Sequence, residues 1–133
     1  MYTLRQFLDS DRSFVIYEGE RELFYSRESD LEPLVQFLDS ATPLGDALTV
    51  FDRYVGRAAA LLISTLRPQK VYTGVISEGG VQVLAEAGIP FEAGEKAKYL
   101  MGVASEDMCR WEKLSIGKSP EELLDELRKI TER

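Results

Sequence analysis

Polar residues follow two predicted strands at the points where helices begin, and they are the first candidates for chemistry. Asp52 comes directly after an apolar segment at 47–51, and Ser77 and Glu78 come directly after another at 70–76. Open α/β sheets bind ligands outside the carboxyl ends of their strands, where the free N–H groups of a helix N-terminus favour an anion. Asp52 and Ser77 are also residue types that cap helices, and a cap is more often only a cap. Both roles stay open for these residues.

The single cysteine is the second candidate. Cys109 lies about one turn into a predicted helix at 105–114, and Glu112 lies on the same side of that helix three residues later. Neighbouring cations would lower the pKa of the thiol and neighbouring carboxylates would raise it, so the sequence leaves the direction open. One interpretation is a nucleophile that relies on Glu112 as its partner. The other, and the commoner, is a small buried apolar residue.

The residue types that are missing restrict the chemistry further. The chain of 133 residues has no histidine and one cysteine. Histidine is the commonest general base, and zinc sites draw mainly on histidine and cysteine. We therefore expect no zinc and no other bound cofactor. Asp52, Glu78 and Glu112 could form an acid–base pair, but among 23 acidic residues some convergence of carboxylates is expected by coincidence.

Composition and charge indicate the class of protein and its partners. Hydrophobic residues make up 44% and charged residues 29% of the chain, as in an ordinary globular protein. No apolar run has the length of a membrane helix, the first residues do not form a secretory signal, and one cysteine agrees with a reducing compartment. We therefore expect a cytoplasmic protein without membrane contact. The net charge of −7 is spread along the chain without a basic face, which argues against nucleic acid as a partner.

The elements that must position the candidate residues alternate along the middle of the chain. Strand, helix, strand, helix and strand patterns follow one another at 47–51, 53–66, 70–76, 78–87 and 89–91. Strands joined by a helix of ten or more residues cannot close as a hairpin, so these strands are expected to pair in parallel. The pattern predicts the α/β class.

The flanking segments predict a hairpin and further helices. Residues rich in β-branched and aromatic side chains at 13–18 and 22–27 surround a turn that contains a glycine, which is typical of a β-hairpin. The segment 96–103 is either a last strand or a bent loop. Helices are predicted at 2–8, at 29–40 and from Ser119 onward, with a loop at 41–46. No linker or repeat divides the chain, so we expect one domain over 1–133.

Three runs of the sequence resemble a known family. They are FDRYVGRAAALL at 51–62, VYTGVISE at 71–78 and CRWE at 109–112. Together they are similar to a small bacterial and archaeal family of unknown function that is assigned to the cytidine-deaminase-like superfamily, over roughly residues 14–112. The resemblance implies a three-layer α/β/α domain with a mixed sheet of about five strands and helices on both faces. It also implies a pocket between the helix that starts near Arg53 and the helix that starts at Ser77.

The same resemblance argues against the deaminase reaction. In zinc deaminases the first of these helices carries His-x-Glu and the second carries Pro-Cys-x-x-Cys. The matching places here hold VGRA at 55–58 and ISEGG at 76–80, so every zinc ligand is missing. Cys109 and Glu112 match a Cys-x-x-Glu of the family. The resemblance therefore implies the location of a pocket, without the metal and without a standard zinc deaminase.

Three functions compete on these grounds. We favour a domain without catalysis that binds a small nucleoside-like or anionic molecule in this pocket, because nothing in the chain supplies an evident base. The residues that would bind the molecule are Asp52, Arg57, Ser77 and Glu78. The second function is a metal-free enzyme that uses Cys109 and Glu112. The third is a protein-interaction or assembly module, including a homo-oligomer, that uses a sheet edge or the C-terminal helix.

Overall fold

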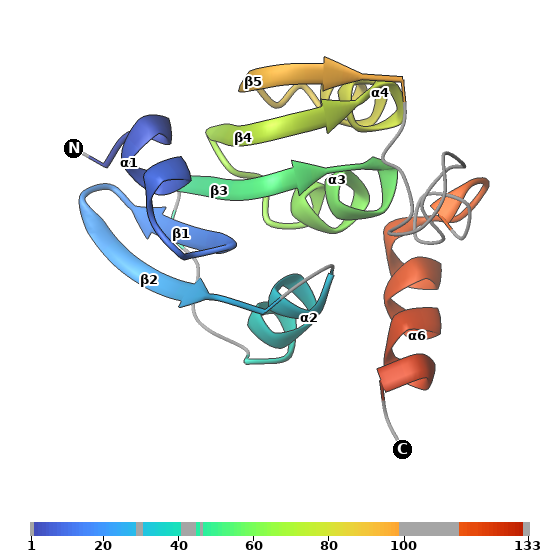
Figure 1. Cartoon of the computed structure of the whole chain (residues 1–133). Coiled ribbons are helices and arrows are strands. Elements are labelled where there is room, and N and C mark those ends of the chain that lie inside the picture. The colour runs from blue at the N-terminus through green and yellow to red at the C-terminus, as the bar shows by residue number, and fades with distance from the viewer. Residues whose placement is uncertain (1, 29–30, 41–44, 46, 99–114, 132–133) are drawn as a thin grey trace.

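A five-stranded mixed sheet is the centre of the computed structural model, which describes residues 2–28, 31–40, 45, 47–98 and 115–131 (Figure 1). The strand order is β2-β1-β3-β4-β5. β1 pairs antiparallel with both β2 and β3, and β3, β4 and β5 pair in parallel. The strands are β1 (Phe14–Glu18), β2 (Arg21–Ser26), β3 (Leu48–Val55), β4 (Lys70–Ser77) and β5 (Phe91–Ala97). The predicted hairpin and the predicted parallel pairing are both confirmed.

Helices lie on both faces of the sheet, in unequal numbers. α3 and α4 are the crossovers between the parallel strands, and together with α2 and α6 they cover one face. Among the described helices, α1 alone covers the other face (Figure 1), which we call the α1 face. The helices are α1 (Leu4–Asp9), α2 (Glu32–Asp39), α3 (Arg57–Ser64), α4 (Glu78–Glu86) and α6 (Pro120–Thr131). None of the described helices is long and apolar enough to cross a bilayer.

The two faces of the sheet bury different kinds of side chain. The larger core lies between the sheet and the four helices and consists mainly of leucine, valine, isoleucine and alanine, with the buried alanines concentrated on α3. The smaller core lies on the α1 face, where Phe7 of α1 packs against Val15 and Phe51 of the sheet. Aromatic rings dominate this second core: the ring centroids of Phe7 and Phe51 are 5.7 Å apart. The α1 face is therefore the aromatic side of the molecule.

The three parallel strands change the face of their side chains halfway along. Val50 and Val55 of β3 both point into the larger core, and so do Val71 and Ile76 of β4. In a regular strand, residues an odd number apart point to opposite faces. Each strand must therefore contain one irregular step between these positions, at which consecutive side chains do not alternate. β3 stays in the sheet to Val55, so the helix predicted from residue 53 begins only at Arg57.

This step lies in one row across the sheet, formed by Arg53, Gly74 and Gly94, which we call the face-change row. The pairing of β3 with β4 passes from Asp52–Thr73 directly to Tyr54–Val75, and β4 with β5 skips the same row. A Cβ atom on Gly74 would lie 3.0 Å from the carbonyl oxygen of Arg53, and one on Gly94 would lie 3.0 Å from that of Gly74. The close backbone approach explains why two of the three residues are glycines.

The remaining sequence predictions have mixed outcomes. The N-terminal start of the last helix is confirmed, since Ser119 N–H donates to Glu122 Oε1 at 3.1 Å and Glu122 N–H donates to Ser119 Oγ at 3.2 Å. β5 begins at Phe91 and runs to Ala97, so the strand predicted at 89–91 was placed too early. The predicted helix at 105–114 and all of the predicted loop at 41–46 except residue 45 lie outside the described residues.

Candidate functional site

The carboxyl ends of β3 and β4 lie side by side, as the sequence predicts for a ligand site. Val55 pairs with Ile76 at the ends of the two strands, and each strand leads within two residues into a helix. Arg57 is the first residue of α3 and follows Gly56, an N-cap residue that provides no side-chain hydrogen bond. The amide N–H groups of the first turn of α3 therefore lack a side-chain cap. This end of the helix carries the partial positive charge that attracts anions.

Ser77 and Glu78 occupy the N-terminus of α4 beside it. Ser77 is fully buried, and its Oγ accepts a hydrogen bond from Gly80 N–H at 3.1 Å, so the capping role predicted for this serine is confirmed. Glu78 is exposed, and its backbone N–H donates to the carbonyl oxygen of Lys98 at 3.3 Å. Of these two residues, Glu78 is the one whose side chain reaches solvent.

Two glycines bring the N-termini of α3 and α4 together. A Cβ atom on Gly80 would lie 2.7 Å from the carbonyl oxygen of Val55 and 3.0 Å from Cγ1 of Ile76. A Cβ atom on Gly79 would lie 3.1 Å from Cβ of Arg57. The start of α4 therefore sits directly on the junction between β3 and α3. Arg57, Ser77 and Glu78 are gathered at one edge of the sheet by this close packing.

Replacing Gly80 by alanine tests this packing. We expect the free energy of unfolding to fall by about 1–3 kcal/mol, because the added methyl group overlaps a backbone carbonyl that has no room to move. Gly79→Ala is the matched control, because both changes add the helix propensity of alanine, worth about 1 kcal/mol. Its nearest neighbour is a side-chain atom, so we expect a smaller loss. Urea denaturation measures both, and a Gly80→Ala protein as stable as the Gly79→Ala protein would contradict the packing.

Asp52 does not join this group, and its predicted place at a helix N-terminus is wrong. It lies inside β3, three residues before the strand ends, and pairs with Phe14 of β1 and Thr73 of β4. Directly paired residues point to the same face, and Phe14 belongs to the larger core, so the Asp52 carboxyl points into that core. Only 7% of the residue is exposed. Asp52 is therefore a buried carboxyl group beneath the helices.

The environment of Asp52 favours its protonated form. Burial raises the pKa of the carboxyl well above its usual value, and hydrogen bonds from the backbone N–H groups of Tyr54 and Arg53 offset part of that effect. No ion pair between described residues includes Asp52. The direction of the shift follows from the cost of placing an uncompensated charge in an apolar interior.

Cys109 and Glu112 both lie outside the described residues, so the nucleophile hypothesis stays a prediction. Within the described ranges, no group of three or more histidine, cysteine, aspartate or glutamate residues is arranged to hold a metal ion.

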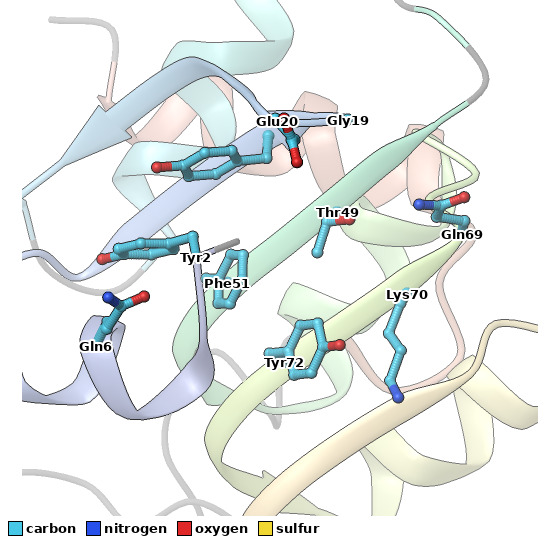
Figure 2. Close-up of a pocket in the computed structure, with 10 residues that line it drawn as sticks. Tyr2, Gln6, Gly19, Glu20, Thr49, Phe51, Gln69, Lys70 and Tyr72 are labelled. Atoms are coloured by element: carbon cyan, nitrogen blue, oxygen red, sulfur yellow. The ribbon is translucent and has the colours of Figure 1, made fainter.

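Sequence reasoning missed an open pocket on the α1 face, at the opposite end of the parallel strands (Figure 2). Its volume is about 790 Å³. It is lined by residues from before and within α1, from the β1–β2 hairpin and from the first residues of β3 and β4. These are Tyr2, Gln6, Tyr17, Gly19, Glu20, Thr49, Phe51, Gln69, Lys70 and Tyr72. The sequence gives no signal for this pocket, because nothing in one strand tells which side chains of other strands lie beside it.

The fold defines a mixed α/β domain in which two helix N-termini meet beside the ends of parallel strands. Arg57, Ser77 and Glu78 lie at this meeting point. Comparison with known proteins identifies the family. The chain belongs to the family described as "TM1506: Domain of unknown function (DUF1893)", whose model matches residues 3–129. No curated protein matches the chain.

A crystal structure of a DUF1893 family protein, TM1506 from Thermotoga maritima, has a similar fold. Its TM-score to this chain is 0.84 at 30% sequence identity, and the match covers 96% of this chain and 86% of that one. The similarity therefore extends over nearly the whole length of this chain. The family description states no activity, so any function must be argued from the site.

Proposed function

We propose that this domain binds a small anionic or nucleoside-like molecule at the carboxyl edge of β3 and β4. The observation that supports the proposal is the N-terminus of α3, where Gly56 leaves the first turn without a side-chain cap and Arg57 adds a guanidinium. Helix N–H groups without a side-chain cap and a nearby cation together suit a phosphate or carboxylate, since the guanidinium can bind both oxygens of such a group.

The other predicted residues take unequal parts in this site. Glu78 is exposed at the adjacent N-terminus of α4, and its carboxylate would accept hydrogen bonds from ligand hydroxyl groups, as acidic residues do with ribose in other α/β proteins. Ser77 supports the site indirectly, because its buried hydroxyl caps α4. Asp52 is assigned no ligand contact, because it points into the larger core.

The order of elements supports the same position for the site. α3 follows β3 and α4 follows β4. The resemblance to cytidine-deaminase-like proteins implies a pocket between these two helices. We take the protein to be cytoplasmic and the binding to be free of zinc chemistry, since the chain lacks histidine and has one cysteine.

Titration of the ¹⁵N-labelled protein with inorganic phosphate and with adenosine 5′-monophosphate tests the proposal. We expect saturable shifts of the amide signals of Arg57, Ala58 and Ala59, with the nucleotide binding more tightly than phosphate because Glu78 contacts its hydroxyl groups. Arg57→Gln is expected to weaken binding about tenfold, the usual effect of losing one charge-assisted interaction.

The matched control is Arg5→Gln, which removes one positive charge from an exposed position on α1 and is expected to leave binding unchanged. Equal affinity in the Arg57→Gln and Arg5→Gln proteins would contradict the proposal. So would shifts that follow phosphate concentration linearly, without saturation, at Arg57, Ala58 and Ala59.

A further inference from the structure

The pocket on the α1 face arises from one short side chain in a row of long ones. Thr49 of β3 pairs with Tyr17 of β1 on one side and with Lys70 of β4 on the other. Directly paired residues point to the same face, so a small hydroxyl group lies between two long side chains. Phe7 of α1 covers the next row, at Phe51, and leaves the Thr49 row uncovered. The hollow above Thr49 is thus a consequence of strand register and the short length of α1.

Aromatic rings form the walls beside this hollow. Phe51 and Tyr72 are stacked with centroids 5.0 Å apart, and Tyr2 and Tyr17 are stacked at 5.1 Å. The two pairs meet edge to face, because the rings of Tyr2 and Phe51 lie 5.0 Å apart at an angle of 76°. Partial burial raises the pKa of Tyr17 above its usual value, so its hydroxyl stays protonated and able to donate. Phe51 itself is buried beneath its neighbours, whereas Tyr2, Tyr17 and Tyr72 are half-buried and offer their rings to the pocket. Such aromatic surface suits a flat ring, by stacking or by edge-to-face contact.

The rim of the pocket supplies polar groups and one cation. Lys70 lies with its Nζ 5.0 Å from the ring centroid of Tyr72, and no ion pair between described residues includes it. Glu20 lies at the opposite rim, with Thr49 between the two charges (Figure 2). The exposed amide side chains of Gln6 and Gln69 also line the pocket. Lys70 is half-buried as a residue, and its ammonium is therefore the group that a negatively charged ligand would meet beside the aromatic wall.

We propose that this pocket is a second ligand site, which takes a flat aromatic ring that carries a carboxylate or another singly attached acidic group. The ring lies over Thr49 beside Tyr72, and the acidic group pairs with Lys70. The amide groups of Gln6 and Gln69 provide hydrogen bonds to polar atoms at the edge of the ring. The site is separate from the carboxyl edge in both position and residues, so it does not depend on the function proposed there.

Indole-3-acetate and tryptamine are the probes that test the site. Both contain the indole ring, but the first carries a negative charge and the second a positive one. The chain has a net charge of −7, so non-specific attraction favours tryptamine. We expect the opposite order: saturable binding of indole-3-acetate, with amide shifts at Thr49, Lys70 and Tyr72. Binding of tryptamine should be weaker by about twofold to fivefold, the range for one partly exposed charge pair. Tryptamine binding as tightly as the acid would overturn the assignment.

Two variants separate charge recognition from shape. Lys70→Gln is expected to weaken binding of indole-3-acetate to the level of tryptamine, and Lys129→Gln, which removes one exposed lysine from α6, is the matched control. Thr49→Leu fills the hollow and is expected to abolish binding of both probes. Circular dichroism establishes whether that variant folds, and Lys70→Gln decides the matter if it does not. Unchanged affinity in Lys70→Gln, or shifts confined to Arg57, Ala58 and Ala59 at the carboxyl edge, would overturn the proposal.

Discussion

Replacing Arg53 by methionine is expected to lower the free energy of unfolding by about 2–4 kcal/mol, because one guanidinium holds the end of α1 on the sheet. Its Nε donates to the carbonyl oxygen of Arg12 at 2.7 Å, and its Nη1 donates to that of Leu8 at 3.2 Å. Its Nη2 donates to the carbonyl oxygens of Phe7, at 3.3 Å, and Ser10. Methionine keeps much of the apolar stem and removes every donor, so four carbonyl groups lose this partner.

Hydrogen exchange shows where the loss of Arg53 acts. We expect amides of α1 to exchange faster in Arg53→Met, while amides of β4 and α3 change only as much as global stability does. Arg53→Lys is the control, because an ammonium keeps the positive charge but lacks the fork that reaches several carbonyl groups. We expect the free energy of unfolding of Arg53→Lys, measured by urea denaturation, to lie between those of the wild type and Arg53→Met. If Arg53→Met is as stable as the wild type, α1 is held by Phe7 and its ring contacts alone.

Asp52→Asn is expected to raise the free energy of unfolding at pH 8 by about 1–3 kcal/mol, the usual cost of a polar group left uncompensated in an apolar interior. In the unfolded chain this carboxyl loses its proton near the ordinary value of 3.8, whereas in the folded protein burial raises its pKa well above that value. Between the two values the folded state holds a proton that the unfolded state has released. Wild-type stability must therefore fall as pH rises through this interval.

Asparagine keeps an oxygen that can accept from the backbone N–H groups of Arg53 and Tyr54, but it carries no charge. The variant should lose the part of the pH dependence that belongs to Asp52 and should gain most above the folded pKa. Urea denaturation at pH 4, 6 and 8 measures the difference. Asp125→Asn, at an exposed position of α6, is the control for a change of net charge. The same pH slope in wild type and Asp52→Asn would show that the buried carboxyl does not titrate in this range.

Local patterns predicted the order and pairing of the elements well. The alternation of strands and helices from residue 47 onward was sufficient to predict the parallel pairing of β3, β4 and β5, because a helical crossover favours strands that run in the same direction. The cap at Ser77 and the start of the last helix at Ser119 were also predicted, because a capping hydrogen bond joins residues three apart in sequence. A single sequence therefore predicts best the interactions between residues that are close to one another along the chain.

Features that depend on register between strands were not predicted. Asp52 was assigned to a helix N-terminus because the sequence pattern ended its strand at Phe51, whereas β3 continues to Val55 paired with β4. The pocket on the α1 face was missed for the same reason. Tyr17, Thr49 and Lys70 are distant in sequence and become neighbours only when three strands take their register. No periodicity within one segment carries that information.

The face-change row also bears on how distant relatives are recognised. A profile that rewards strict alternation of apolar and polar positions would divide β3 at Arg53 and β4 at Gly74 into two short pieces each. A chain with this architecture should instead keep apolar residues five positions apart on both strands, as at Val50 and Val55, with glycine near the middle of the second strand. A search for this spacing of apolar residues and glycine, rather than for a reactive group, should find homologues whose overall sequence has diverged.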